Sequence, residues 1–149
     1  MPFVSVTRLR LRSARFVPPF ALHTWLAMRQ ARHADGFHSG GVFSDRKLAF
    51  WTMTLWWNEA DMRRYMGAGA HRRAMPKLAR WCDEASIVRW TAEAAPGRPE
   101  AERRMRRAGR PSKVRHPVSR HADLALDPLD MARAARVLRL APIDRHDTA

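Results

Sequence analysis

The chain has 149 residues, with 28 Lys or Arg against 14 Asp or Glu, which gives a formal charge of +14. This length fits one domain with an appended segment. No run of about 18 apolar residues is present, which excludes an ordinary transmembrane helix. The only cysteine is Cys82, which excludes an internal disulfide.

The first fifteen residues also lack the apolar stretch of a secretory signal peptide. Arg8, Arg10 and Arg12 interrupt the region where that stretch would lie. The lone cysteine requires no oxidising compartment. We therefore expect a cytoplasmic protein with no membrane span.

The alternation of side chains predicts the first strand over 3–12, where Leu9 and Leu11 alternate with arginines. A Pro-Pro step then opens a helix over 20–33, since proline suits the first turn. A strand follows over 37–44, and a polar connection leads into the next strand over 48–57.

The strand over 48–57 is heavily apolar on both faces. Phe50 and Trp56 share one face with two threonines, whereas Trp51, Met53 and Leu55 share the other. One layer of helices covers only one side of a sheet. We therefore expect the other side to meet a second sheet, a partner subunit or a closed pocket.

The next segment predicts a helix capped by Asn58, because Asn accepts a hydrogen bond from the first turn and acidic residues follow it. A second helix is predicted over 70–81 and a last strand over 85–92. The order β-α-β-β-α-β is that of the α+β, ferredoxin-like class, a four-stranded antiparallel sheet with helices on one face. Packing of two such sheets in a homodimer would cover the second face.

The chain changes character after this unit. Every Trp, Phe and Tyr lies between Phe3 and Trp90, and a segment without large aromatics has little to bury. We expect the domain to span 1–93, followed by a basic flexible tail over 94–149 with a helix over 127–140. The basic stretch 98–120 indicates either a solvated linker or a nucleic-acid contact, and the linker is favoured because no aromatics are interleaved for base stacking.

The segment from Phe50 to Trp81 resembles the antibiotic-biosynthesis-monooxygenase-like, dimeric α/β-barrel superfamily, and within it small proteins related to spheroidene monooxygenase. A strand ending in Thr54 and a Trp pair, an acidic helix start at Glu59, Tyr65 and a helix with His71 carry this resemblance. It implies a barrel shared by two subunits. It also implies a pocket for a hydrophobic aromatic or isoprenoid molecule, oxidised without a cofactor or with haem.

His71 is the candidate catalytic residue, as a group that transfers protons or as an axial ligand if haem binds. The alternative is a histidine that only fixes the helix junction through a backbone carbonyl. The candidate substrate-binding residues are Trp25, Trp51, Trp56 and Tyr65, whose rings suit a flat apolar ligand. Their alternative role is in the core or in a dimer interface.

No metal site is predicted, because the other histidines lack a ligand spacing. Three functions therefore remain open. The first is a homodimeric small-molecule monooxygenase, the second a non-catalytic ligand-binding or interaction protein on the same fold, and the third a basic nucleic-acid-associated protein. A pocket that reaches His71 would favour the first, and a pocket filled by Trp side chains the second.

Overall fold

The computed structural model describes residues 2–44, 47–118 and 135–141. The strands are β1 (Phe3–Leu11), β2 (Phe37–Ser44), β3 (Ala49–Trp56), β4 (Cys82–Thr91), β5 (Arg110–Pro111) and β6 (Ala135–Leu140). The helices are α1 (Val17–His33), α2 (Glu59–Met66), α3 (Gly69–Trp81) and α4 (Arg98–Ala108), with a short 3₁₀ turn over Ala14–Phe16.

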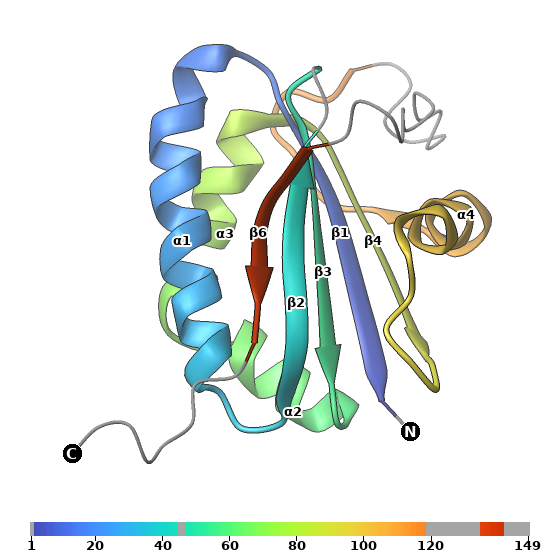
Figure 1. Ribbon diagram of the computed structural model, residues 1–149. Coiled ribbons are helices and arrows are strands. Elements are labelled where there is room, and N and C mark those ends of the chain that lie inside the picture. The colour runs from blue at the N-terminus through green and yellow to red at the C-terminus, as the bar shows by residue number, and fades with distance from the viewer. Residues whose placement is uncertain (1, 45–46, 119–134, 142–149) are drawn as a thin grey trace.

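The strands form one sheet in the order β5-β4-β1-β3-β2-β6, and the pairs are antiparallel. The four inner strands and the first three helices follow the predicted β-α-β-β-α-β order, so the ferredoxin-like α+β fold is confirmed (Figure 1). The sheet is wider than the four strands expected, because the C-terminal part of the chain adds one strand at each edge.

The first face of the sheet is covered by α1, α2 and α3 (Figure 1). Proline occupies the first turn of α1, where its missing N–H is not needed. Asn58 caps α2, since its side chain accepts a hydrogen bond of 2.9 Å from the N–H of Asp61. These local signals explain why both helices begin close to where the sequence predicts them.

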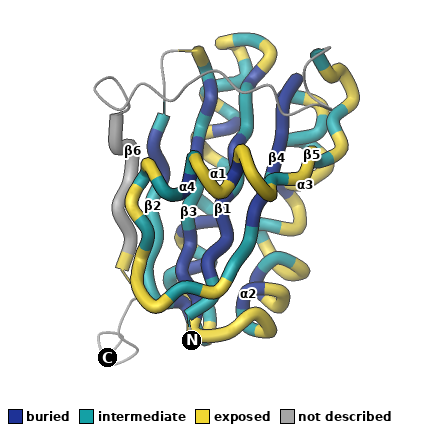
Figure 2. Tube along the Cα trace, turned by 90° about the vertical axis from the view of Figure 1, so that its right-hand side faces the viewer, coloured by how far each residue is buried: buried dark blue, intermediate teal, exposed yellow. Residues whose placement is uncertain are grey.

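The second face of the sheet is covered by α4, which corrects the expectation of a flexible tail over this segment (Figure 2). Ala101 and Met105 are fully buried and pack in one cluster with Val6, Trp51 and Val88. These two apolar residues are four apart, so they share a side of the helix. Glutamate and arginine pairs at the same spacing, such as Glu102 with Arg106 at 3.0 Å, lie on its outer side.

The position of α4 also corrects the expectation that helices occupy only one face of the sheet. The two-sided burial of β3 is confirmed, since Trp51 and Trp56 are both buried and point to opposite faces. A segment of the same chain, α4, packs on Trp51. The need to cover this face was the reason for expecting a homodimer, and α4 now supplies part of that cover.

A buried ion pair extends the second face towards one end of β1 and β4. The Arg8 guanidinium donates to the carboxylate of Glu84 at 2.6 Å, and both residues are almost inaccessible to solvent. Arg10 contacts Glu84 and Asp83 at 3.3 Å each. Among the arginines that alternate along β1, Arg8 therefore lies in the protein interior.

The helix predicted over 127–140 is wrong where it can be compared. Residues 127–134 lie outside the described residues, whereas Ala135–Leu140 forms β6, which pairs antiparallel with β2. An uncovered edge strand leaves a row of unpaired N–H and C=O groups. Pairing with β2 satisfies that row, which a helix could not do. In the described part of the chain, none of the helices is long and apolar enough to cross a membrane.

Replacement of Met105 tests whether α4 is an integral part of the domain. Met105→Ala should lower the free energy of unfolding by about 2–5 kcal/mol, because it leaves a cavity under a fully buried side chain. Arg103→Ala on the exposed side of the same helix should change it by less than about 0.5 kcal/mol. Urea denaturation followed by circular dichroism measures both, and equal stability of the two variants would show that α4 is not docked.

Candidate functional site

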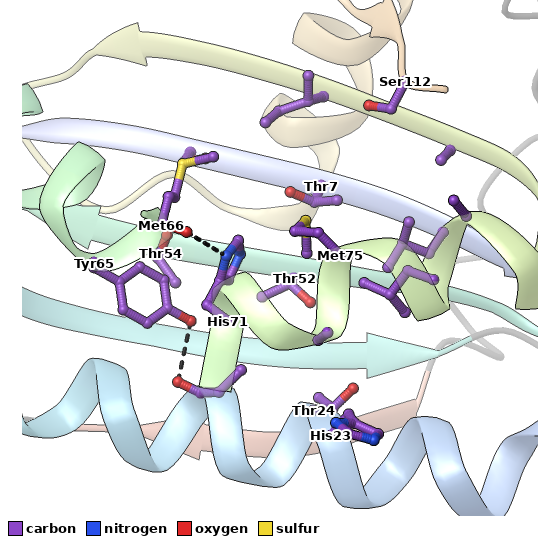
Figure 3. A pocket seen from close by; sticks show the side chains of 18 of the residues that line it. Thr7, His23, Thr24, Thr52, Thr54, Tyr65, Met66, His71, Met75 and Ser112 are labelled. Atoms are coloured by element: carbon purple, nitrogen blue, oxygen red, sulfur yellow. Dashed lines mark hydrogen bonds between the residues drawn. The ribbon is translucent and has the colours of Figure 1, made fainter. Parts of the chain in front are cut away.

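A cavity of about 290 Å³ lies between the first face of the sheet and helices α1 and α3 (Figure 3). Residues 112–114, which follow β5, also contribute to its wall. Most of the lining is apolar, and a few hydroxyl groups and basic side chains interrupt it. An apolar hollow with a few polar groups is the usual form of a small-molecule site.

The floor of the cavity is made by hydroxyl residues at the centre of β1 and β3. Ser5 pairs with Thr54 and Thr7 pairs with Thr52 across the two strands. All four line the cavity. Thr54 accepts a hydrogen bond of 3.0 Å from the indole N–H of the buried Trp56. Its own hydroxyl hydrogen is consequently available to an acceptor in the cavity.

His71 lies in the first turn of α3, and its ring borders the cavity (Figure 3). Its Nδ1 is 3.2 Å from the carbonyl oxygen of Met66, a contact that requires a proton on Nδ1. Nε2 then carries a lone pair and makes no hydrogen bond within the described part of the chain. Burial lowers the pKa of His71 below 6.5, the contact with Met66 opposes this, and the charge of Arg89 lowers it further.

Tyr65 stands beside His71, with ring centroids 4.9 Å apart. Its hydroxyl donates to the carbonyl oxygen of Ala27 at 3.0 Å. Burial raises the pKa of this phenol far above its usual range, so Tyr65 stays protonated. Because its proton is already donated, Tyr65 forms a wall of the cavity and holds α1 against α2.

The side-chain amide of Gln30 fixes the backbone around His71. Its nitrogen donates to the carbonyls of Tyr65 at 3.1 Å and Ala68 at 2.8 Å, and its oxygen accepts from the backbone N–H of His71 at 2.9 Å. Ala68 has no side chain that can cap α3. Gln30 therefore supplies, from another helix, the cap that the start of α3 needs.

Gly69 makes this close approach feasible. Its φ is +55°, which favours glycine, and a Cβ at this position would lie 3.0 Å from the Gln30 side chain.

Two of the predicted site residues, Tyr65 and His71, meet at the cavity, whereas the three tryptophans do not line it. Trp25 projects from α1 and is 52% exposed, and Trp51 is buried on the opposite face of the sheet under α4. Trp56 packs behind Tyr65, with centroids 5.0 Å apart. Alternation along β3 assigns a face to each of Trp51 and Trp56, but the cavity occupies only the centre of the strand.

Sequence reasoning missed Arg89 and Gln30. Arg89 lies on β4 and points to the cavity side together with Ala85 and Ile87. The period of two along β4 was the signal that could have placed it. Gln30 gave no such signal, because its partners are 35 to 41 residues away in sequence.

Cys82 does not contribute a reactive thiol. It is fully buried beside β1, and burial together with the charge of Asp83 raises the pKa of its thiol to about 12. A thiol with such a pKa is a poor nucleophile at neutral pH. Among the described residues, no group of three His, Cys, Asp or Glu side chains is placed to hold a metal ion.

Comparisons with known proteins support the fold of this chain. No family model and no curated protein matches the sequence. A conserved protein from Methanosarcina mazei has 14% sequence identity and a TM-score of 0.57, covering 62% of this chain and 94% of its own. A Nitrosomonas europaea protein named as a candidate antibiotic biosynthesis monooxygenase has 12% identity and a TM-score of 0.57, covering 64% and 94%.

A crystal structure of an antibiotic biosynthesis monooxygenase has 12% identity and a TM-score of 0.55, covering 62% of this chain and 99% of its own. The fold of the domain is thus that of antibiotic-biosynthesis-monooxygenase structures, as the sequence resemblance implies. At these identities the likeness concerns the fold alone.

Loss of the Gln30 amide should loosen the junction that carries His71. Gln30→Ala removes three hydrogen bonds and should lower the free energy of unfolding by about 1–3 kcal/mol. Arg29→Ala, on the exposed side of the same helix, is the matched control and should change it by less than about 0.5 kcal/mol. Chemical denaturation measures both, and a Gln30 variant as stable as the control would contradict the capping role.

Proposed function

We propose that this protein is a small-molecule monooxygenase that acts on a hydrophobic substrate held in the cavity. The observation that carries this proposal is the contact of His71 Nδ1 with the Met66 carbonyl at the edge of an apolar cavity of about 290 Å³, because this contact assigns the ring proton to Nδ1 and the lone pair to Nε2. The shared fold with antibiotic-biosynthesis-monooxygenase structures supports the reaction class by analogy. The described lining of the cavity contains no tryptophan, so the condition that would favour a non-catalytic binding protein is not met.

In this proposal, His71 acts as a general base. A substrate with an acidic C–H gives its proton to Nε2, and the carbanion left behind reduces oxygen. For a methylene flanked by activating groups, the balance is R₂CH₂ + O₂ → R₂C=O + H₂O. The substrate supplies all the electrons, so the protein contributes a base, a dry cavity and hydrogen-bond donors.

Substrates of an aromatic kind fit this chemistry better than simple isoprenoids do. An aromatic ketone or phenol spreads the negative charge of the carbanion over its rings and onto oxygen. The hydroxyl of Thr54 can donate to such an oxygen, since its own acceptor lone pair already serves Trp56. An isoprenoid without an ionisable group offers neither the acidic proton nor the oxygen.

Haem is the cofactor that the family resemblance allows, and the donor chemistry of the cavity is compatible with it. The free ring nitrogen of His71 is of a type that could hold the iron, while Arg89 and Lys113 line the same cavity and are residue types that pair with carboxylates. Haem would supply an iron for oxygen chemistry. His71 would then hold the iron and would no longer be available as a base.

A homodimer and a cytoplasmic location remain part of the proposal. A fully sheet-to-sheet dimer would have to displace α4 from its cluster with Val6 and Trp51, so a dimer contact beside α4 is the arrangement compatible with this chain. The nucleic-acid alternative keeps some support from exposed arginines on α4, such as Arg103 and Arg107. Their charge suits a polyanion without specifying one.

Oxygen consumption with anthrone, a tricyclic compound with an acidic methylene, tests the proposed activity. The full-length protein should accelerate oxygen uptake and form anthraquinone, and His71→Ala should lower the rate by about 100- to 10,000-fold, as loss of a general base does. His33→Ala, an exposed histidine on α1, serves as the matched control. Retinol provides the isoprenoid arm, for which no acceleration is expected.

Absorption spectra with added haemin separate the two cofactor models. A Soret band that shifts on binding and is altered in His71→Ala would show that haem binds at His71 and would support the haem-dependent model. Acceleration without haem, insensitive to chelators, would support the cofactor-free route. If neither anthrone nor haemin responds to the protein and ligands still bind, the protein is a carrier and the monooxygenase proposal is wrong.

The pH dependence of this activity follows from the environment of His71. Burial and the nearby Arg89 lower the pKa of His71 below 6.5, so the imidazole stays neutral to a lower pH than usual. The rate constant kcat/KM should therefore fall only below a midpoint that lies under pH 6.5, where Nε2 becomes protonated. A midpoint at or above 6.5 would exclude His71 in this environment as the base.

A further inference from the structure

The basic groups at the cavity stand without acidic counterparts. His23, His71, Arg89 and Lys113 line it, and no Asp or Glu is among its described lining residues. His23 already contacts the ammonium of Lys77 at 3.3 Å, and Lys113 is exposed. Arg89 is the charged group whose own hydrogen bonds remain incomplete.

The guanidinium of Arg89 has only a weak partner among the described residues. Its Nη2 lies 3.2 Å from the sulfur of Met66, and thioether sulfur is a poor acceptor. Its Nε is buried and has no hydrogen-bond partner. A guanidinium carries five N–H donors in a rigid fork that matches a carboxylate or other oxyanion, so Arg89 is prepared for an acceptor that the protein does not supply.

A neighbouring carboxylate does not neutralise Arg89. Glu59 is close enough to interact, but it is bound to Arg63 at 2.5 Å. The effect of Arg63 on Arg89 exceeds that of Glu59, and burial lowers the pKa of Arg89 more than either. Among the described residues, Arg89 thus has no carboxylate hydrogen-bonded to it at this end of the cavity.

The polar row beside Arg89 continues across the sheet. Ser5 on β1 pairs with Arg89 on β4 on one side and with Thr54 on β3 on the other. All three residues line the cavity. One cation and two hydroxyls thus lie side by side at this end of the hydroxyl-lined floor.

We propose that the cavity binds an apolar molecule that carries a single anionic oxygen group, a carboxylate or a phenolate, with Arg89 as the partner of that group. This inference rests on the proposed function and narrows its substrate class. The apolar body of the ligand lies against α1 and α3, and its anionic end faces the row of Arg89, Ser5 and Thr54. Neutral hydrocarbons, including simple isoprenoids, leave Arg89 without an acceptor and bind more weakly.

Binding of matched probes under nitrogen tests this inference, because none of the probes needs oxygen. Equilibrium dialysis compares 2-naphthoate with neutral 2-naphthamide, and 2,4-dinitro-1-naphtholate with its neutral methyl ether. The wild-type protein should prefer the anion of at least one pair by about 10- to 100-fold, the effect of a hydrogen bond to a charged group. The pair that shows the preference identifies the carboxylate or the phenolate as the source of the charge.

Arg89→Met should abolish that preference, because it lowers the affinity for the anionic probe by the same factor. The affinity for the neutral probe should change less than about twofold. Arg89→Lys keeps the charge and should retain part of the preference. Arg103→Met, on α4 at the opposite face of the sheet, removes an equal charge and should leave the anion preference unchanged. This control distinguishes binding at Arg89 from the general attraction of anions to a protein with a formal charge of +14. Thermal unfolding confirms that each variant folds.

Equal binding of anion and neutral probe in both pairs by the wild-type protein overturns this inference, whether or not the Arg89 variants fold. Loss of the preference in Arg103→Met as well as in Arg89→Met also overturns it. Oxygenation of anthrone without any anion preference would leave the monooxygenase proposal standing and remove this one. An anion preference without oxygenation would support this inference and contradict the monooxygenase proposal, and the protein would then be a carrier of hydrophobic acids.

Discussion

The structure depends on the burial of both faces of β1 and β3, the two central strands. Strands with apolar side chains on both sides cannot leave either side in water, because each exposed large side chain forgoes about 1.5–3 kcal/mol. The helices α1 to α3 cover one side and α4 covers the other. The last aromatic residue, Trp90, lies before α4, so the segment after it contributes stability through small and flexible side chains, Ala101 and Met105.

The two covered faces differ in the side chains at their centres. On the second face, Trp51, Leu55 and Val6 pack in the cluster with α4. On the first face, the centre of β1 and β3 carries Ser5, Thr7, Thr52 and Thr54. Larger residues border the cavity around this floor, including Phe20 from α1 and Met62 from α2. The cavity thus lies over short hydroxyl side chains at the middle of β1 and β3.

Much of this architecture could be predicted from local sequence signals, and the exceptions have physical causes. Alternation placed β1 and the two faces of β3, turn signals bounded β2, and Pro18 and Asn58 marked two helix starts. The segment that forms α4 was predicted to be a flexible tail because it is mostly charged and has only two apolar residues that become buried, Ala101 and Met105. The site was predicted in part. The position of His71 at the start of a helix could be inferred from a resemblance. The absence of Trp51 and Trp56 from the lining of the cavity could not, because it depends on where the helices pack on the sheet. Alternation along β4 could have placed Arg89 on the cavity face, whereas the contacts of Gln30 join parts of the chain 35 to 41 residues apart, which local patterns cannot specify.

One charge links the two chemical roles assigned to the cavity. Burial and, to a smaller extent, the charge of Arg89 lower the pKa of His71 and favour the neutral form that a base requires. The same guanidinium would attract the anion that forms when a ligand gives up its proton. In the proposed reaction, transfer of that proton to His71 would make a cation near Arg89, which is unfavourable, and an anion beside it, which is favourable. The proposed reaction would therefore be assisted only if the anion lies between the two basic groups. A bound oxyanion in that position would compensate the repulsion of Arg89 and His71, and the incomplete hydrogen bonding of Arg89 would be satisfied by the ligand itself.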